Sequence, residues 1–338
     1  MRYNMPMRKL IYTAALGLFF LAARGLCAAP IPMAPSASIP AGAQFGQPYQ
    51  LRDSVAFTVK SAKYTVERVN IGAASYFPQA GEKLLVLHFR VQNLTKDTLS
   101  FDAGTIPFSV VDAAGVTHKS VQDVGLESSH ATAEFDLKPG EAKEDLYTVL
   151  ITSAAGADAA LIVEAGREGI DEDELRFPLA GKITPLPAIF ASPDDRSGMS
   201  ALKSVPAVAG TFYPLALLNA RLDSIAYTDQ SLGGTPPEEG QRYFTATFTI
   251  QNKSAGMHGI SGMNFVPVLR DTDGHIAEYN QAVLKPLIDA TGDTVLKQDA
   301  EATIRFFWTL PKAAHALSLR LAEGQSRTYL FDVSGPKL

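Results

Sequence analysis

The chain of 338 residues has a single cysteine, Cys27. This cysteine lies near the end of residues 1–28, which have the features of a secretory signal: basic residues first, then an apolar stretch over 10–23, then Leu-Cys-Ala. The apolar stretch is shorter than the ~20 residues that a membrane-spanning helix needs. We therefore predict a cleaved signal peptide. The mature chain then has no cysteine, which excludes disulfide bonds and a cysteine nucleophile.

Two alternatives stay open for this segment. Residues 1–28 could remain as an uncleaved anchor, or Cys27 could be lipidated. A lipoprotein signal has leucine and a small residue at the positions that Arg24 and Leu26 occupy here. Cleavage is therefore the prediction that we keep, and it places the protein in the periplasm or outside the cell.

Charged residues are also few, at 19% of the chain, and the 30 basic residues are outnumbered by the 35 acidic ones. They form no basic cluster of the kind that attaches proteins to nucleic acid or to anionic membranes. We therefore expect no nucleic-acid partner, and we expect no transmembrane segment in the mature chain. The hydrophobic content of 46% suits packed globular domains.

The sequence lacks the motifs of common catalytic and nucleotide-binding sites. It has no Gly-x-Ser-x-Gly elbow, no His-Glu-x-x-His pair, no phosphate loop and no dinucleotide fingerprint. The six histidines show no ligand spacing. We therefore predict a protein that is not an enzyme and needs no cofactor.

Strict alternation of apolar and polar residues is the main pattern present, and it occurs twice. One constant shift of 159 residues aligns the two occurrences over about sixty residues. The aligned residues are Gly81 and Gly240, Phe89 and Phe248, Asn93 and Asn252, Asp112 and Asp271, and Gly115 and Gly274. Alternation of this kind is typical of half-buried strands in antiparallel sheets. In the first copy Leu84 and Val86 also make the outer face apolar, so we expect something to cover it.

About seven short strands in each copy, separated by turn residues, predict an all-β protein of two tandem immunoglobulin-like antiparallel β-sandwiches. The only candidates for helices are short, at 120–130 and 281–289. We predict a signal peptide at 1–28, a flexible leader at 29–47, a first sandwich at 48–182, a Pro-rich linker at 183–206 and a second sandwich at 207–335.

Three segments carry a family resemblance. They are the alternating strand that ends in Asn93, the turn from Asp112 to Gly115, and Leu137-Lys-Pro-Gly-Glu141. The chain resembles secreted bacterial immunoglobulin-like domains of unknown function, related in shape to the mycobacterial secreted immunoprotective antigen. The second copy departs from this pattern at residues 296–299, where Pro-Gly is lost. The resemblance implies a β-sandwich and an exported location, and it carries over no catalytic residue.

Candidate sites are few. Met257, His258 and Met263 are weak candidates for a metal site, because thioether and imidazole suit copper. The acidic run of the first copy is a candidate contact for a basic partner or a divalent ion, the alternative being a solvated loop. Its residues are Glu168, Asp171, Glu172, Asp173 and Glu174. Asn93 and Asn252 begin glycosylation sequons, although turn-forming asparagine explains both.

These observations predict a non-catalytic exported protein whose tandem modules bind or support a cell-envelope or extracellular partner. The alternative is a periplasmic protein that binds a metal or a small ligand. The expected partner is an unknown envelope or extracellular protein, because none of the sequence motifs identifies it.

Overall fold

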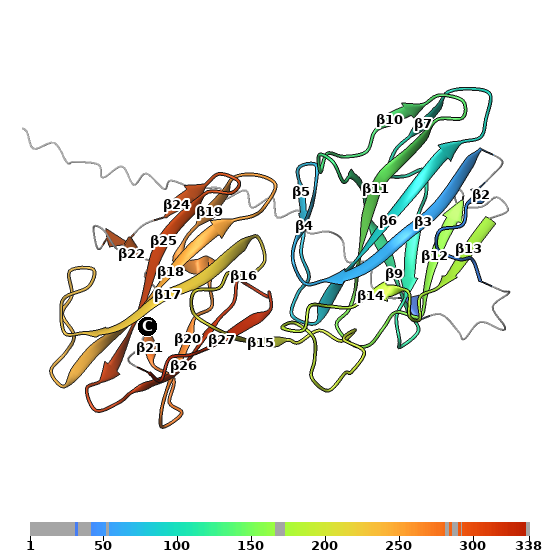
Figure 1. Ribbon diagram of the computed structural model, residues 1–338. Coiled ribbons are helices and arrows are strands. Elements are labelled where there is room, and N and C mark those ends of the chain that lie inside the picture. Colours follow the sequence, from blue (N-terminus) through green and yellow to red (C-terminus); the bar gives the residue numbers. More distant parts are fainter. Residues whose placement is uncertain are drawn as a thin grey trace, which may run out of the picture.

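The computed structural model describes residues 31–32, 42–51, 54–165, 173–280, 284–285, 290–291 and 293–335. Within these ranges the chain is all-β, with no α-helix and one short 3₁₀ turn, η1 (Gly262–Asn264). The prediction of an all-β protein is confirmed. Two bodies of strands lie side by side (Figure 1), and none of the described strands pairs across from one body to the other. We call them the first half, up to residue 184, and the second half, from residue 204.

The described residues of the first half form fourteen strands. They are β1 (Ile31–Pro32), β2 (Tyr49–Leu51), β3 (Val55–Thr65), β4 (Val69–Ile71), β5 (Ala74–Tyr76), β6 (Glu82–Asn93), β7 (Leu99–Phe101), β8 (Phe108–Val111), β9 (Val116–Leu126), β10 (Phe135–Leu137), β11 (Ala142–Ser153), β12 (Ala160–Ala165), β13 (Asp173–Pro178) and β14 (Ile183–Thr184). The main sheet runs β13-β12-β8-β9-β11-β6-β3-β14. Strand β9 pairs with β8 near its start and with β11 near its end, so one long strand joins two layers.

The second half contains thirteen strands. They are β15 (Ser204–Ala207), β16 (Tyr213–Pro214), β17 (Leu218–Thr228), β18 (Gln241–Asn252), β19 (His258–Ile260), β20 (Val268–Asp271), β21 (Glu278–Tyr279), β22 (Leu284–Lys285), β23 (Ala290–Thr291), β24 (Thr294–Leu296), β25 (Glu301–Pro311), β26 (Ala316–Leu321) and β27 (Thr328–Asp332). One sheet has the order β15-β27-β26-β20, and another runs β16-β17-β18-β25-β22-β23, with β21 also paired to β25; β19 and β24 form a separate pair.

The apolar face of the central strand lines the core in each half, as the alternation predicts. Phe89 on β6 and Phe248 on β18 are both fully buried, at 0% exposure. The Phe89 ring packs 5.0 Å from that of Phe108 on β8, in the facing layer. The Phe248 ring lies 5.8 Å from that of Phe331 on β27. Aromatic rings at these separations hold the two layers of each half together.

The asparagine that ends the central strand makes the same bonds in both halves. Asn93 donates its amide hydrogens to the carbonyl oxygens of Asp97, at 2.7 Å, and Leu137, at 2.9 Å. Asn252 donates to Gly256 at 2.7 Å and Leu296 at 3.0 Å. Each asparagine is fully buried, and its side-chain oxygen accepts from the residue two positions later. Both side chains are therefore structural, which favours the turn interpretation of these residues over glycosylation.

Two elements differ from the sequence prediction. Residues 120–126, expected to begin a short helix, belong to β9, and a turn follows them. Pairing with β8 and β11 satisfies the backbone of this segment, so tertiary context overrides its weak helical spacing. The other helix candidate, 281–289, is strand at 284–285 and otherwise lies outside the described residues. No described helix could cross a membrane, since none is both long and apolar enough.

The leader and the linker are attached wherever they are described. Residues 42–47 bond to the first half, with the Gly46 N–H donating to the Val59 carbonyl at 2.8 Å. In the linker, Leu186 and Phe190 are buried in a core that continues from one half to the other. This linker is therefore packed rather than a free spacer.

The apolar outer face of β6 is covered, as expected. Leu84 and Val86 join a small separate core with Tyr147 and Val149 from β11. Strands β4 and β5 form the hairpin over it, with Ile71 as the buried residue. This hairpin projects from the first half toward the second (Figure 1). It is the element that positions the candidate site.

Candidate functional site at the junction of the two halves

Arg68, at the base of the β4–β5 hairpin, reaches into the second half. Its guanidinium donates to the carbonyl oxygen of Ala216 at 2.7 Å and to Oδ1 of Asn219 at 2.6 Å. Burial lowers the pKa of Arg68 to about 10, so the group stays cationic at neutral pH. A guanidinium suits this place because it offers several donors in one plane.

Glu323 holds the same turn from the opposite side. Its Oε2 accepts the backbone N–H groups of Ala216, Leu217 and Leu218 at 2.9, 3.0 and 3.1 Å. The residue is only 7% exposed, and burial raises the pKa of its carboxyl, while the three N–H bonds act in the opposite direction. Arg68 therefore binds the carbonyl side of the turn and Glu323 binds its amide side.

Among the described residues, three further hydrogen bonds that involve side chains other than that of Arg68 join the two halves. They run from Asn70 Nδ2 to the Lys253 carbonyl at 2.9 Å, from the Ala255 N–H to Ser75 Oγ at 2.8 Å, and from Arg327 Nη2 to the Glu82 carbonyl at 2.8 Å. Backbone and side-chain groups from both halves take part. A junction built in this way fixes the halves in one arrangement.

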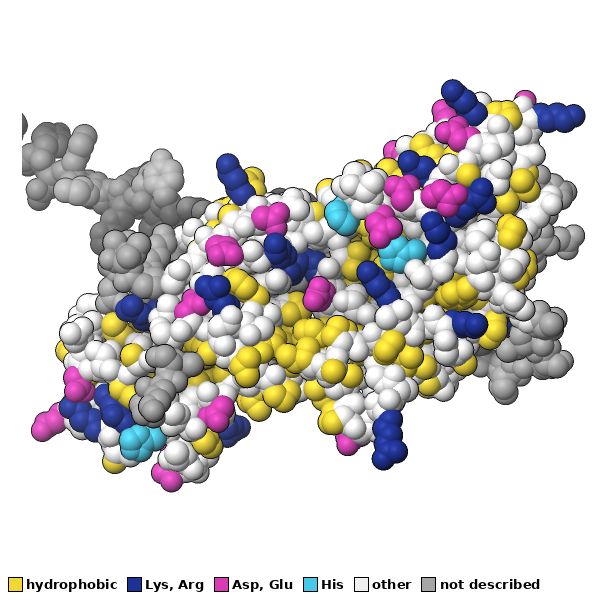
Figure 2. All heavy atoms as spheres, in the orientation of Figure 1, with side chains coloured by type: hydrophobic (Ala, Val, Ile, Leu, Met, Phe, Trp, Pro, Cys, Tyr) yellow, Lys and Arg dark blue, Asp and Glu magenta, His cyan; other side chains and the backbone are white. Residues whose placement is uncertain are grey.

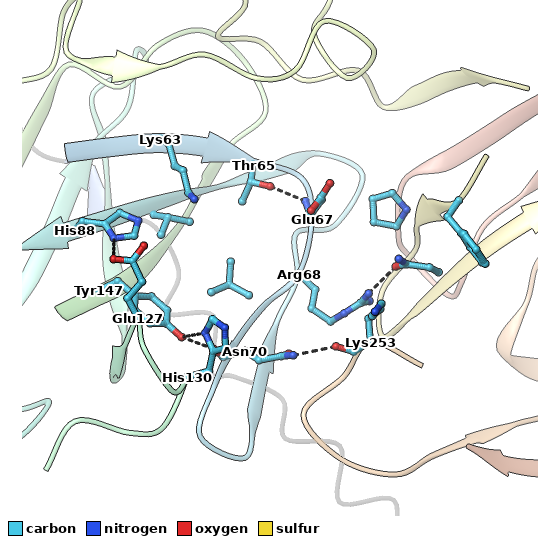
Figure 3. A pocket seen from close by; sticks show the side chains of 15 residues that line it. Lys63, Thr65, Glu67, Arg68, Asn70, His88, Glu127, His130, Tyr147 and Lys253 are labelled. Atoms are coloured by element: carbon cyan, nitrogen blue, oxygen red, sulfur yellow. Dashed lines mark hydrogen bonds and ion pairs between the residues drawn. The ribbon is translucent and has the colours of Figure 1, made fainter. Parts of the chain in front are cut away.

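A cavity of about 450 Å³ lies at this junction, and we call it the junction groove. Its lining from the first half is Lys63, Thr65, Glu67, Arg68, Val69, Asn70, Val86, His88, Glu127, His130 and Tyr147, and from the second half Phe212, Pro214, Asn219 and Lys253. Figure 3 shows the polar side chains around this hollow, with Arg68 directed away from it toward the second half. On the surface, histidine, acidic and basic side chains gather on the first half near the junction (Figure 2).

His88 lies at the wall of the groove opposite the hairpin. Its Nδ1 is 3.6 Å from Oε2 of Glu127. Burial lowers the pKa of His88, and the charges of Lys63 and Lys60 lower it further, while Glu127 acts in the opposite direction. His88 therefore favours its neutral form, with a ring nitrogen available for hydrogen bonding.

Tyr147 links the loop at His130 to the hairpin. Its hydroxyl donates to the Asn70 carbonyl at 2.6 Å and lies 3.1 Å from Nδ1 of His130. Because the hydroxyl donates its one hydrogen to the Asn70 carbonyl, Nδ1 of His130 is the donor in the contact between His130 and Tyr147. Burial raises the pKa of Tyr147 to about 12, so this hydroxyl is a link rather than a base. Gly125 makes room for the ring, since a Cβ there would lie 2.5 Å from it.

A second hollow of about 300 Å³ has Lys63, His88 and Glu127 in common with the junction groove. Lys60, Ser61 and Glu144 complete its lining. The two hollows are therefore neighbours along the outer face of β3 and β6. Together they offer room for a ligand longer than a single ion.

Lys83 forms a separate buried cluster that secures the linker. Its ammonium donates to the carbonyl oxygens of Gly156 and, at 2.7 Å, Met199, and lies 4.1 Å from the centre of the Tyr64 ring. Burial lowers its pKa to about 8. Tyr64 in turn donates to Asp158 at 2.7 Å. We interpret this cluster as structural, since neither cavity includes it.

The three weak metal candidates lie in different environments. Met257 and Met263 are 74% and 90% exposed. The His258 ring points inward, where Nε2 is buried without a hydrogen bond, 3.6 Å from Oε1 of Glu323. The described residues do contain one set of carboxylate and imidazole atoms within 4.8 Å of one another, at Asp271, Asp273 and His275. There Asp271 also accepts two backbone N–H groups, as Asp112 does in the first half.

Two of the five acidic candidates lie in β13, which pairs with β12. Glu168, Asp171 and Glu172 lie outside the described residues. Asp173 begins β13, and the next residue, Glu174, forms an ion pair with Arg176. Glu174 also faces Glu164 across the two strands. This partner contact stays a prediction.

The residues of the junction groove are absent from the sequence-based candidates. Arg68, His130 and Lys253 come from loops and strand ends that are far apart in the chain, and no spacing connects them. The sequence does contain one indication of the groove. The apolar outer face at Leu84 and Val86 predicts that another element covers this strand. That element is the hairpin that builds the groove.

Comparison with known proteins adds little to this geometry. No family model matches the chain, and no curated protein matches it. An uncharacterized β-sandwich protein from Clostridium difficile 630 is similar at a TM-score of 0.29 and 14% identity, over 38% of this chain and 95% of that one. A candidate lipoprotein from Bacillus subtilis subsp. subtilis str. 168 is similar at a TM-score of 0.27 and 11% identity, over 38% of each chain. Likeness at this level carries no argument about function.

Proposed function

We propose that this chain is a non-catalytic exported protein of two tandem immunoglobulin-like sandwiches, which binds a cell-envelope or extracellular partner in the junction groove. The signal-like residues 1–28 support export. The observation that carries the binding role is that both halves line the groove and are bonded to each other beside it. A preformed cleft between rigid elements binds without the cost of ordering itself.

Equivalent contacts support the tandem arrangement. Beyond the asparagines described above, Tyr64 accepts the N–H of Asp158 at 2.8 Å, and Tyr227 accepts that of Ala316 at 2.7 Å. A cation covers each tyrosine ring, Lys83 over the first and Arg242 over the second. Lys83 and Arg242 are related by the same shift of 159 residues as the asparagines. Duplication of one ancestral module explains such pairs simply.

Site-specific photo-crosslinking in the native cells tests the proposed function. A photoreactive amino acid replaces Glu67, which is exposed and lines the groove. The control replaces Lys119, an exposed residue of β9 that lines neither hollow. We expect a discrete adduct from position 67 and none from position 119. We expect the protein to be in an extracytoplasmic fraction, with residues 1–28 removed. Equal labelling from both positions, or no adduct from 67, contradicts the proposal.

A further inference from the structure

The groove lining includes one ammonium without a partner among the described residues, that of Lys63, beside the carboxylates of Glu67 and Glu127. Arg68 and Lys253 also line the groove but are already bonded elsewhere. Lys60 and Lys63 both lie close enough to His88 to lower its pKa. Lys60 is paired with Glu144 at 3.4 Å. The backbone of Lys63 pairs within the sheet, but its ammonium has neither a hydrogen bond nor an ion pair with any described residue. An ammonium left in this state favours a negatively charged ligand.

A hydroxyl donor and an imidazole that can be protonated accompany this ammonium on the same face. Thr65, two residues after Lys63 on β3, uses its oxygen to accept the Glu67 N–H at 3.0 Å, which leaves its own hydroxyl proton to donate. His88, on the adjacent strand β6, directs Nδ1 toward Glu127, so Nε2 can donate to an anion only when the ring is protonated. In Figure 3 Lys63, Thr65 and His88 border one end of the hollow. An ammonium beside an O–H donor and an imidazole that can be protonated is a typical binding site for an oxyanion.

Glu127 also lines the groove, but its ion pair is with His88 rather than with Lys63. Its side chain is 62% exposed, and its nearest ionisable partner is His88. An anion near Lys63 also favours protonation of His88, and the imidazolium then pairs with both the anion and Glu127. Affinity for the anion therefore increases as the pH falls.

We propose that the junction groove binds an oxyanion, a carboxylate or phosphate group held by Lys63 with Thr65 and His88. This inference rests on the proposed function, since it gives the chemistry of the group that the partner places in the groove. The cavity of about 450 Å³ accommodates an organic body attached to the anion. Val69 and Val86 supply an apolar wall for that body.

The test is an NMR titration of the purified chain with inorganic phosphate and, separately, with citrate, at constant ionic strength. The signals followed are the imidazole protons of His88, with those of exposed His275 as the internal control. We expect saturable shifts at His88 with at least one of the two anions, and tighter binding at pH 6 than at pH 8. The anion that binds identifies the source as a phosphate or a carboxylate.

Variants decide the role of Lys63. Lys63→Gln should weaken binding at least tenfold, Lys63→Arg should preserve it, and the matched control Lys119→Gln should leave it unchanged. Both positions, 63 and 119, are exposed, so we expect the three variants to keep the fold, and the dispersion of their NMR spectra verifies it. No saturable shift with either anion, or Lys63→Gln binding as tightly as the wild type, overturns the inference. If position 67 gives a crosslinked adduct but neither anion binds in the NMR titration, the groove recognises its partner by other chemistry. If an anion binds but position 67 gives no adduct, the proposal of a partner in the groove fails and the anion site stands.

Discussion

Single charged residues act beside the shared apolar core where the two halves meet. Arg68 and Glu323 hold opposite sides of one turn, and each is the type of group that can satisfy several backbone partners at once. Burying these charges is costly unless they are fully bonded. Their removal should therefore reveal their contribution clearly.

Glu323→Ala leaves three backbone N–H groups without their acceptor, each at a cost of roughly 1–3 kcal/mol. We expect the free energy of unfolding to fall by about 3 kcal/mol or more. Glu323→Gln keeps an acceptor oxygen and should cost less. Urea denaturation measures both, with exposed Glu239→Ala as the control. A loss below about 1 kcal/mol in Glu323→Ala would mean that water replaces the carboxylate.

Two histidines should make the protein sensitive to acid. Burial lowers the pKa values of His88 and His258 below the ordinary value near 6.5. As the pH falls below about 6.5, the unfolded chain takes up protons that the folded chain resists, so stability decreases. The double variant His88→Gln, His258→Gln should lose less stability between pH 7 and pH 5. Urea midpoints at the two pH values measure this, and His275→Gln should behave as the wild type does.

At the scale of elements, the β4–β5 hairpin has two roles. It covers the outer face of β6 and β11, and it supplies Arg68 and Asn70 to the junction or its edge. Residues 66–76 therefore connect the stability of the first half to the position of the second. A hairpin with only three paired positions is not stable alone, so its packing must hold it in place.

Ile71→Ala tests this connection. The side chain is 1% exposed, and truncating a buried isoleucine costs about 2–5 kcal/mol. We also expect faster amide exchange throughout residues 66–76, because the hairpin loses its main apolar contact. Hydrogen exchange with mass spectrometry measures the second effect. The matched control is Leu232→Ala, which removes a buried side chain from the separate cluster of Leu232, Tyr243 and Phe307 in the second half. It should leave exchange in the hairpin unchanged.

Strands were more predictable than the site because strand periodicity is local. Alternation around Phe89 and Phe248 identified the central strands, and the turn residues Asp112 and Gly115 identified the end of β8. The segment 120–126 was assigned wrongly because β9 changes partners along its length, which no local pattern reports. The groove was missed for a similar reason. Arg68 and Glu323 are 255 residues apart in the sequence. They meet only because both bind the turn at residues 216–218, and the sequence around neither residue indicates this.

At the scale of the whole molecule, the junction should behave as one rigid unit. Five or more hydrogen bonds cross it beside a continuous core. Interfaces between domains of one chain usually permit motion unless they are large or well bonded. Rigidity here would keep both walls of the groove at a constant separation.

Small-angle X-ray scattering of Arg68→Ala, combined with Arg327→Ala, tests this rigidity. Both guanidinium groups bond across the junction, to Ala216 and to Glu82. The wild type should fit a single compact conformation, while the double variant should have a larger radius of gyration at unchanged sheet content. Arg196→Ala, in the linker, is the control. A radius of gyration identical to that of the wild type would show that the remaining contacts are sufficient.

The two buried asparagines limit how this protein can be produced. Asn93 and Asn252 lie in acceptor sequences that eukaryotic secretory cells modify on the growing polypeptide, before the sheets assemble. A sugar attached at that stage replaces an amide hydrogen that the finished strand end requires, and it is too bulky for a fully buried position. Yeast or mammalian secretion should therefore yield trapped, misassembled material. A bacterial host without this modification avoids the conflict.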